Sequence, residues 1–179
     1  EPEVIKSYGA GLVQDPKPPW NYKLSFHING LTNEYYGSAL FLRDGKVTEV
    51  PCFEGFEELE FPEPLGKLEA VVTSGGLSTL PYTLEGKLQT LENKTLRYSG
   101  HSAQFKDYSQ LGLFELEPVE VNGKEIIPRD FYHTLLEPKI TDSSFKDIGI
   151  LKLFAFGKKD GKSAKAEIEL IDKYDDETG

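Results

Sequence analysis

The chain has 179 residues, 38% hydrophobic and 12% aromatic, which suits one folded domain and excludes a disordered chain. Its formal net charge of −10 argues against a nucleic-acid partner, because phosphate binding depends on clustered lysine and arginine. No apolar run approaches the roughly 20 residues of a membrane span, and no signal peptide is visible, so no membrane partner is expected. The lone cysteine, Cys52, is typical of a reducing compartment and predicts a cytoplasmic protein.

The predicted elements are mostly strands. Asp-Gly or Asn-Gly pairs supply the positive φ angles of two-residue hairpin turns at 43–46, 121–124 and 159–162. Strands are expected at 4–9, 38–42, 46–50, 57–61, 66–73, 90–98, 148–157 and 163–172. In the last strand apolar and charged side chains alternate from Ala164 to Leu170, which predicts a sheet with one buried and one wetter face.

Helices are fewer. They are expected at 28–36, 77–85, 101–111 and 128–137. In the third, Ser102 is a candidate N-cap and Gly112 a stop signal. The fourth begins with Pro128, which suits a first helical turn, and is expected to end before Pro138. The predicted fold class is α+β, a largely antiparallel mixed β-sheet with helices packed on one face.

One glycine pair resembles a dinucleotide-binding fingerprint, but the motif is incomplete. Gly9 and Gly11 follow the first strand as in a dinucleotide fingerprint, but the third glycine position holds Gln14. Prolines close behind it exclude the helix that would receive a pyrophosphate. The three histidines share no metal-ligand spacing, and we expect His27 and His133 to be structural. We therefore expect neither a cofactor-binding residue nor a metal site in this chain.

The stretch TSGGLST at 73–79 follows an apolar strand. Ser74, Gly75 and Gly76 would let backbone N–H groups approach a ligand closely, because glycine adds no side chain and tolerates unusual φ angles. A plain turn into the next helix explains the same residues equally well. Both interpretations stay open.

The stretch KTLRYSGH at 94–101 begins as a strand and breaks just before a helix. Arg97, Tyr98 and His101 stand at this break. An arginine at a strand end is usually solvated, yet arginine is also the preferred bidentate clamp for a carboxylate. Because side chains alternate along a strand, Arg97 and Tyr98 cannot face the same side without a break.

Three segments carry a family resemblance. VVTSGGLSTL, KTLRYSGHSAQFKDYSQLGL and VEVNGKEIIPRDFYHTLLEPKI resemble the saccharopine dehydrogenase-like oxidoreductases, most closely the lysine 6-dehydrogenase branch. The resemblance extends in order over nearly the whole chain, and TLRYSGH is its most specific part.

The resemblance implies a domain organisation. It identifies 1–179 as a single substrate-binding and dimerisation domain, and the absence of methionine together with abrupt ends predicts excision from a two-domain Rossmann enzyme. NAD or NADP would be bound by the Rossmann domain, which is absent from this chain. The family moves hydride from the amine carbon of lysine or saccharopine to that cofactor. The implied partners are an amino-acid substrate, the chain's own Rossmann domain and a second copy in a homo-oligomer.

The resemblance also implies site residues. Arg97 is the expected clamp for the substrate carboxylate, with Tyr98 and His101 beside it, and an imidazole there could bind substrate or move protons. Phe26 matches an aromatic position near the substrate pocket. The version of 74–76 found here favours lysine over saccharopine. No catalytic residue is assigned. The alternative is a non-catalytic α+β binding or scaffold module related to the family by ancestry only.

Overall fold

The computed structural model describes residues 1–177. Its strands are β1 (Pro2–Val13), β2 (Ser38–Arg43), β3 (Lys46–Pro51), β4 (Glu57–Glu60), β5 (Lys67–Val71), β6 (Thr90–Tyr98), β7 (Val119–Val121), β8 (Lys124–Ile126), β9 (Asp147–Lys159) and β10 (Lys162–Lys173). Its helices are α1 (Ile28–Glu34), α2 (Leu80–Leu84), α3 (His101–Gln110) and α4 (Pro128–Ile140). The predicted strands and helices are all present, although β1 runs four residues past its expected end at residue 9.

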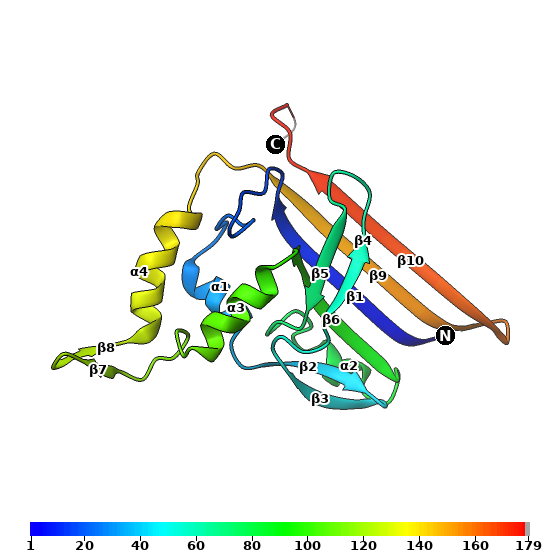
Figure 1. Ribbon diagram of the computed structural model, residues 1–179. Coiled ribbons are helices and arrows are strands. Elements are labelled where there is room, and N and C mark those ends of the chain that lie inside the picture. The colour runs from blue at the N-terminus through cyan, green and yellow to red at the C-terminus, as the bar shows by residue number, and fades with distance from the viewer. Residues whose placement is uncertain (178–179) are drawn as a thin grey trace.

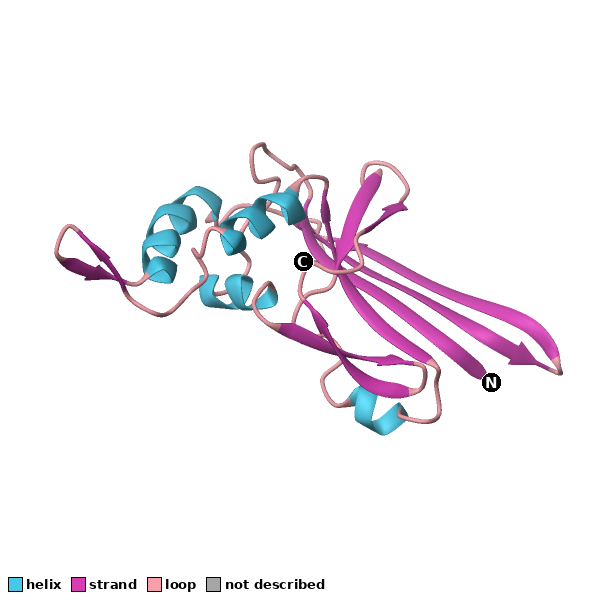
Figure 2. Cartoon of the chain, turned by 60° about the horizontal axis from the view of Figure 1, so that its bottom comes forward, coloured by secondary structure: helices cyan, strands magenta, loops and turns pink. Residues whose placement is uncertain are grey.

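One eight-stranded sheet organises the chain. Its main path is β10-β9-β1-β6-β2-β3, with β5 also pairing with β6 and β4 pairing with β5. Among the described strands only β1 and β6 pair in parallel, which confirms the predicted α+β class with a largely antiparallel mixed sheet. Helices α1, α3 and α4 gather at one end, while β1, β9 and β10 extend away from them (Figures 1 and 2). The short β7–β8 hairpin projects beyond α4.

The three predicted hairpin turns are confirmed. Asp44 and Gly45 have φ angles of 51° and 76°, and the Asn-Gly and Asp-Gly pairs of the other two hairpins are nearly identical. Positive φ at both central residues gives the turn a twist that matches the twist of the flanking strands. The turns therefore set the register of β2–β3, β7–β8 and β9–β10 from local chemistry alone.

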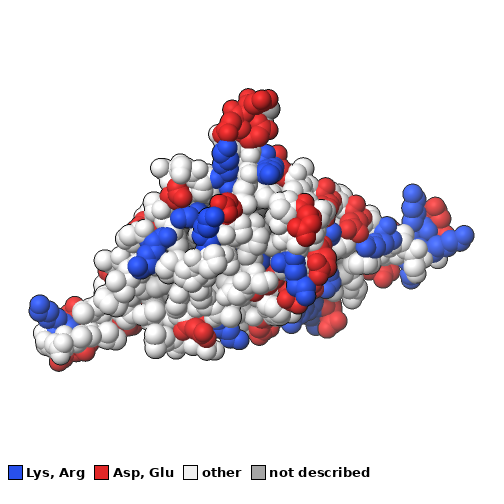
Figure 3. Space-filling view, turned by 45° about the horizontal axis from the view of Figure 1, so that its top comes forward, with Lys and Arg blue, Asp and Glu red and all other residues white. Residues whose placement is uncertain are grey.

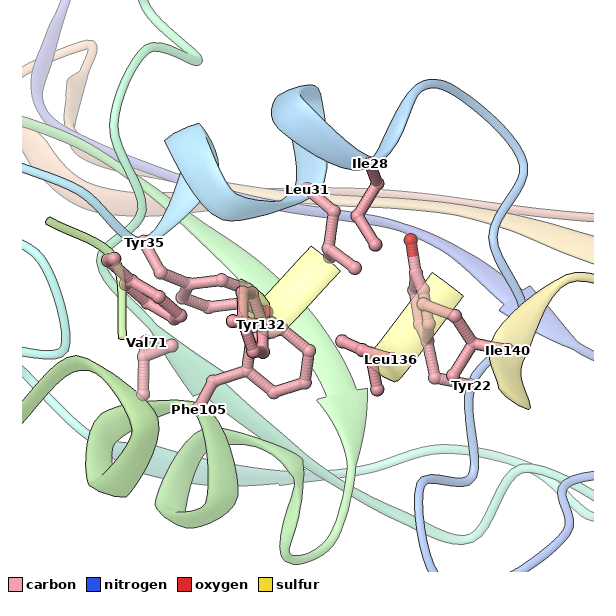
Figure 4. Packing of buried hydrophobic residues seen from close by; sticks show 10 residues of the cluster. Tyr22, Ile28, Leu31, Tyr35, Val71, Phe105, Tyr132, Leu136 and Ile140 are labelled. Atoms are coloured by element: carbon pink, nitrogen blue, oxygen red, sulfur yellow. The ribbon is translucent and has the colours of Figure 1, made fainter. Parts of the chain in front are cut away.

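The helices enclose a core of their own, separate from the cores on the sheet. We call this cluster the helical core, and its buried members are Tyr22, Ile28, Leu31, Tyr35, Val71, Phe105, Phe114, Tyr132, Leu136 and Ile140. Figure 4 shows Ile28 and Leu31 descending from α1 toward Tyr132, with Phe105 of α3 approaching from the other side. Burying so many aromatic rings fixes α1 and α3 against the end of β6.

Helix α3 is capped differently from the prediction. Ser102 is not its N-cap, because that position is held by Gly100, whose φ of 93° suits glycine. The carboxylate of Glu69 on β5 accepts hydrogen bonds from the backbone N–H groups of Gly100 (2.9 Å) and Ser102. A capping oxygen from a distant strand satisfies donors that no local side chain reaches.

Helix α4 also departs from the prediction. It continues through Pro138 to Ile140 instead of ending at residue 137. Leu136 and Ile140 are buried in the helical core, and burial of the last turn outweighs the one backbone hydrogen bond that proline removes.

The outer strand β10 is more exposed than expected. Its side chains do alternate, but Ile168 and Leu170, on the supposedly buried face, are 58% and 57% exposed. The reason is position, since β10 is the edge strand and the helices lie at the opposite end of the sheet. On the face seen in Figure 3, charges of both signs are interspersed over the described residues, and acidic side chains gather at the C-terminal end.

The Glu69 cap yields a stability prediction. We expect Glu69→Gln to lower the free energy of unfolding by about 1–3 kcal/mol, because a buried backbone donor loses its acceptor. Urea unfolding followed by circular dichroism measures this change. The control is Glu58→Gln, which removes an exposed partner of Lys67 and should leave the midpoint almost unchanged. Equal effects of the two variants would contradict the capping role of Glu69.

Candidate functional site

A cavity of about 310 Å³ lies where the sheet meets the helices. It is lined by Gly9, Ala10, Gly11, Tyr22, Ser25, Phe26, Glu34, Asn93, Thr95 and Arg97. This volume is at the lower end of the range for small-molecule sites. A larger hollow of about 600 Å³ lies at the tip of the β9–β10 hairpin, but none of the residues that line it is buried, so it brings no buried polar groups together. The smaller cavity is the better candidate site.

The floor of the cavity is bare backbone. Gly9 and Gly11 lie inside β1 on the side that also carries Thr95 and Arg97 of β6, which we call the cavity face. A Cβ built on Gly11 would meet no described atom within 4 Å, and one on Gly9 would meet only the Ile150 carbonyl at 3.8 Å. The two glycines thus leave open the space that side chains would otherwise fill.

An ion pair crosses the cavity wall. Arg97 of β6 donates from Nη2 to Oε2 of Glu34, the last residue of α1, at 2.7 Å. Its Nη1 donates to the Leu96 carbonyl at 3.0 Å, and Tyr35 also lies beside the guanidinium, whereas Nε makes no hydrogen bond of normal geometry among residues 1–177. The side chain of Arg97 is 4% exposed and that of Glu34 is 29% exposed. The guanidinium is therefore largely buried, and the carboxylate is the more accessible member of the pair.

Burial shapes the electrostatics of the wall. Desolvation raises the pKa of Glu34, and the charge of Arg97 opposes this rise. Burial also raises the pKa of Tyr22 to about 12, again against the influence of Arg97, so the phenol stays protonated at neutral pH. The Tyr22 ring lies 5.5 Å from the guanidinium carbon, and its hydroxyl is a buried donor with no partner in the described chain.

The loop at 73–79 lies next to the cavity wall and holds the end of α1. The Ser74 N–H donates to the Glu34 carbonyl at 2.8 Å, and the Ser74 hydroxyl donates to the Asn33 carbonyl. Gly76 has a φ of 79° and leaves room for the amide of Asn93, with which any Cβ would collide. Ser74, Gly75 and Gly76 do not line the cavity; this loop anchors the end of α1 and seats Asn93.

Phe26 forms an aromatic part of the cavity wall. Phe26 lines the cavity and packs on Gly30 of α1, where an added Cβ would lie only 2.8 Å from its ring. Phe26 is 43% exposed, which leaves much of the ring available for contact. The structure thus brings Phe26 and Arg97, two of the expected site residues, to the lining of one cavity.

His101 lies beneath the cavity rather than in its lining. Its ring stacks on Phe105 with a centroid separation of 4.2 Å and contacts Tyr22 at 5.2 Å. Burial, and then the nearby charge of Arg97, lower the pKa of His101 well below its ordinary value. The imidazole is consequently neutral at physiological pH and supports the ring of Tyr22 from below.

Tyr98 faces the other side of β6. Its hydroxyl donates to the Val13 carbonyl at 2.8 Å, and its ring packs with the core cluster on that side of the sheet. The predicted divergence of Arg97 and Tyr98 is confirmed, and Tyr98 lies outside the cavity lining.

The sequence interpretation missed Glu34, Tyr22 and Asn93. Glu34 could have been found from its position at the C-terminal end of a helix. A carboxylate there lies at the negative end of the helix dipole and is unfavourable unless a cation lies nearby. Tyr22 lies in an irregular segment, and its place beside Arg97 depends on contacts distant in sequence.

The remaining candidate groups have structural roles. His27 accepts from the Asn29 N–H at the start of α1, and His133 bonds Thr32 at 2.7 Å. Burial raises the pKa of the Cys52 thiol to about 11, which disfavours a thiolate nucleophile. Among residues 1–177 no three His, Cys, Asp or Glu side chains form a metal-binding group, and no described helix is both long and apolar enough to cross a bilayer.

Comparison with known proteins gives a consistent result. The profile of the family described as saccharopine dehydrogenase C-terminal domain matches residues 2–179. A solved structure, apo histidine-tagged saccharopine dehydrogenase (L-Glu forming) from Saccharomyces cerevisiae, shares the fold with a TM-score of 0.72 at 18% identity. The match covers 97% of this chain and 53% of the yeast chain, so this chain spans about half the length of that enzyme. The chain belongs to the saccharopine dehydrogenase C-terminal domain family.

Proposed function

We propose that this chain is the substrate-binding domain of an NAD(P)-dependent amino-acid dehydrogenase that oxidises an amine carbon by hydride transfer. The observation that carries the proposal is that Arg97 and Tyr22 line one cavity, and that the Arg97 Nε–H and the Tyr22 hydroxyl are buried without a partner among residues 1–177. Buried donors normally have acceptors, and a carboxylate supplies two oxygens to such donors. The bare floor at Gly9 and Gly11 leaves space for that ligand.

The chemistry of arginine supports a carboxylate ligand. A guanidinium has five N–H donors in a fixed fork, and two hydrogen bonds of Arg97 lie within the described chain. The protonated Tyr22 adds a donor on the same side. We favour lysine over saccharopine because Ser74, Gly75 and Gly76 resemble the lysine 6-dehydrogenase branch, and we expect a cytoplasmic location from the lone cysteine.

The redox cofactor does not fit the described residues. Gly9 and Gly11 lie inside β1 and not in a turn from a strand into a helix, so they offer no cradle for a pyrophosphate. We therefore assign NAD or NADP to a Rossmann domain elsewhere in the parent enzyme. The contribution of this chain is to bind and orient the amino acid.

The first test concerns the proposed clamp. In the intact enzyme we expect Arg97→Lys to raise KM for the amino-acid substrate about 10-fold or more, because lysine keeps the charge but loses the fork. KM for NAD(P) should not change. The matched control is Arg43→Lys in the exposed β2–β3 hairpin. An unchanged KM for every amino acid tested, with the thermal midpoint intact, would remove Arg97 from the site.

The second test concerns the division of labour. Calorimetry with NAD and with NADP should detect no binding to this chain alone. Micromolar affinity for either nucleotide would overturn the assignment of the cofactor to another domain. It would also favour a different role for the glycines of β1.

We also propose that two copies associate through the exposed sheet at β9 and β10. Leu151 and Leu170 are direct cross-strand neighbours on the cavity face, and both are exposed, as is Ile168. A contiguous apolar strip along an open edge strand is typical of an interaction surface. The alternative, a non-catalytic binding or scaffold module, could share this surface and the cavity, and turnover of an amino acid with NAD(P) by the intact protein distinguishes it from the proposed enzyme domain.

The proposed dimer can be tested by measuring the molecular mass in solution. Ile168→Asp should convert a dimer into a monomer in size-exclusion chromatography with light scattering, because it places a charge on the apolar strip. Ser163→Asp puts the same side chain on the opposite face of β10 and should leave the dimer intact. A monomeric unmodified chain at high micromolar concentration would contradict the proposal.

A further inference from the structure

We propose that Glu34 binds the α-ammonium group of the substrate while Arg97 holds its α-carboxylate, so that the ion pair recognises a zwitterionic amino-acid head group. This inference rests on the proposed function and extends it to a residue that the sequence interpretation did not select. Glu34 would determine specificity, because it distinguishes an amino acid from a simple carboxylic acid.

The first support is the unused bonding capacity of Glu34. A carboxylate has about four lone-pair positions, and the Arg97 bond to Oε2 occupies one of them. The side chain lines the cavity and keeps 29% of its surface exposed, against 4% for Arg97. The negative oxygen is thus the most accessible charged group of the pair.

The second support is the spatial order of donors and acceptors. Unpartnered donors lie on the side of Arg97 and Tyr22, and free acceptor capacity lies on the side of Glu34. The α-carbon of an amino acid likewise carries an acceptor group, the carboxylate, and a donor group, the ammonium, close together. The 2.7 Å separation of Nη2 and Oε2 places the two protein charges side by side to meet them.

The third support is charge balance. The pair carries no net charge, and it is held in a partly desolvated wall. A ligand with only one charge would leave an excess charge in that wall, which is costly where water is excluded. A zwitterion adds one charge of each sign and keeps the site neutral.

The backbone around Glu34 is held in place for this role. Its carbonyl accepts from the Ser74 N–H at 2.8 Å and lies 3.5 Å from the Cys52 sulfur. A carboxylate at the end of a short helix would otherwise move with the fraying last turn. Fixing the main chain therefore limits the positions that the carboxylate can take.

The test is an NMR titration of this chain with three matched probes. L-Lysine carries both α groups, 6-aminohexanoate lacks the α-ammonium, and cadaverine lacks the α-carboxylate. We expect lysine to bind about 10- to 100-fold more tightly than either analogue, the range for hydrogen bonds to charged groups. Chemical-shift changes should include the amides of Glu34 and Arg97.

Two variants sharpen the result. Glu34→Gln should reduce the preference for lysine over 6-aminohexanoate to about twofold or less, since the charge that meets the ammonium is gone. Glu34→Asp keeps the charge on a shorter side chain and should retain a partial preference. Glu54→Gln, on an exposed loop, is the control and should behave as the unmodified chain.

The outcomes separate the two proposals. Equal affinities of the unmodified chain for lysine and 6-aminohexanoate, both tighter than for cadaverine, would overturn the role of Glu34 and leave Arg97 as a clamp. No binding of any probe would overturn the proposed function and this inference together. If Glu34→Gln does not fold, the comparison of probes on the unmodified chain and on Glu34→Asp still decides between these results.

Discussion

The ion pair between Arg97 and Glu34 connects the two parts of this molecule. Arg97 extends from the middle sheet strand β6, and Glu34 ends the first helix of the helical layer. Burying a guanidinium without a counter-ion would cost more than the fold gains from any single contact. The position of α1 is therefore tied to the end of β6, and the cavity is the space left around that tie. Ser74 and Gly76 contribute to the same junction, because Ser74 hydrogen-bonds to the end of α1 and Gly76 leaves room for Asn93.

The uneven coverage of the sheet follows from where the helices are anchored. Aromatic packing in the helical core holds α1, α3 and α4 over one end, and the Glu69 carboxylate fixes the start of α3 there. The long strands β1, β9 and β10 then extend beyond the helices (Figure 2), and on the cavity face Leu151, Ile168 and Leu170 are exposed. The cavity and the open apolar strip lie on the same face of the sheet, because Gly9 of β1 pairs directly with Leu151 of β9. A second copy on the strip would thus lie close to the cavity.

Features that depend on neighbouring residues could be predicted from the sequence, whereas contacts between distant residues could not. The Asp-Gly and Asn-Gly turns, the strand at 90–98 and the opposed faces of Arg97 and Tyr98 all follow from rules that act over a few residues, and each is confirmed. The cap of α3 by Glu69 and the pairing of Arg97 with Glu34 join residues 31 to 63 positions apart, and no local pattern encodes them. The exposure of Ile168 escaped for a related reason, since alternation tells which side chains share a face but not whether anything covers it.

An ion pair formed within the domain itself has a consequence for the proposed binding. In the proposed binding mode the ligand meets a donor of Arg97 and lone pairs of Glu34 that their mutual bond leaves unused, so the pair persists and both groups are already held in place. A ligand that engages Arg97 but brings no ammonium would leave an excess negative charge in a partly desolvated wall, and that cost falls on such a ligand alone. A preformed, neutral pair therefore favours selectivity, which is what the proposed recognition of one class of amino acid requires.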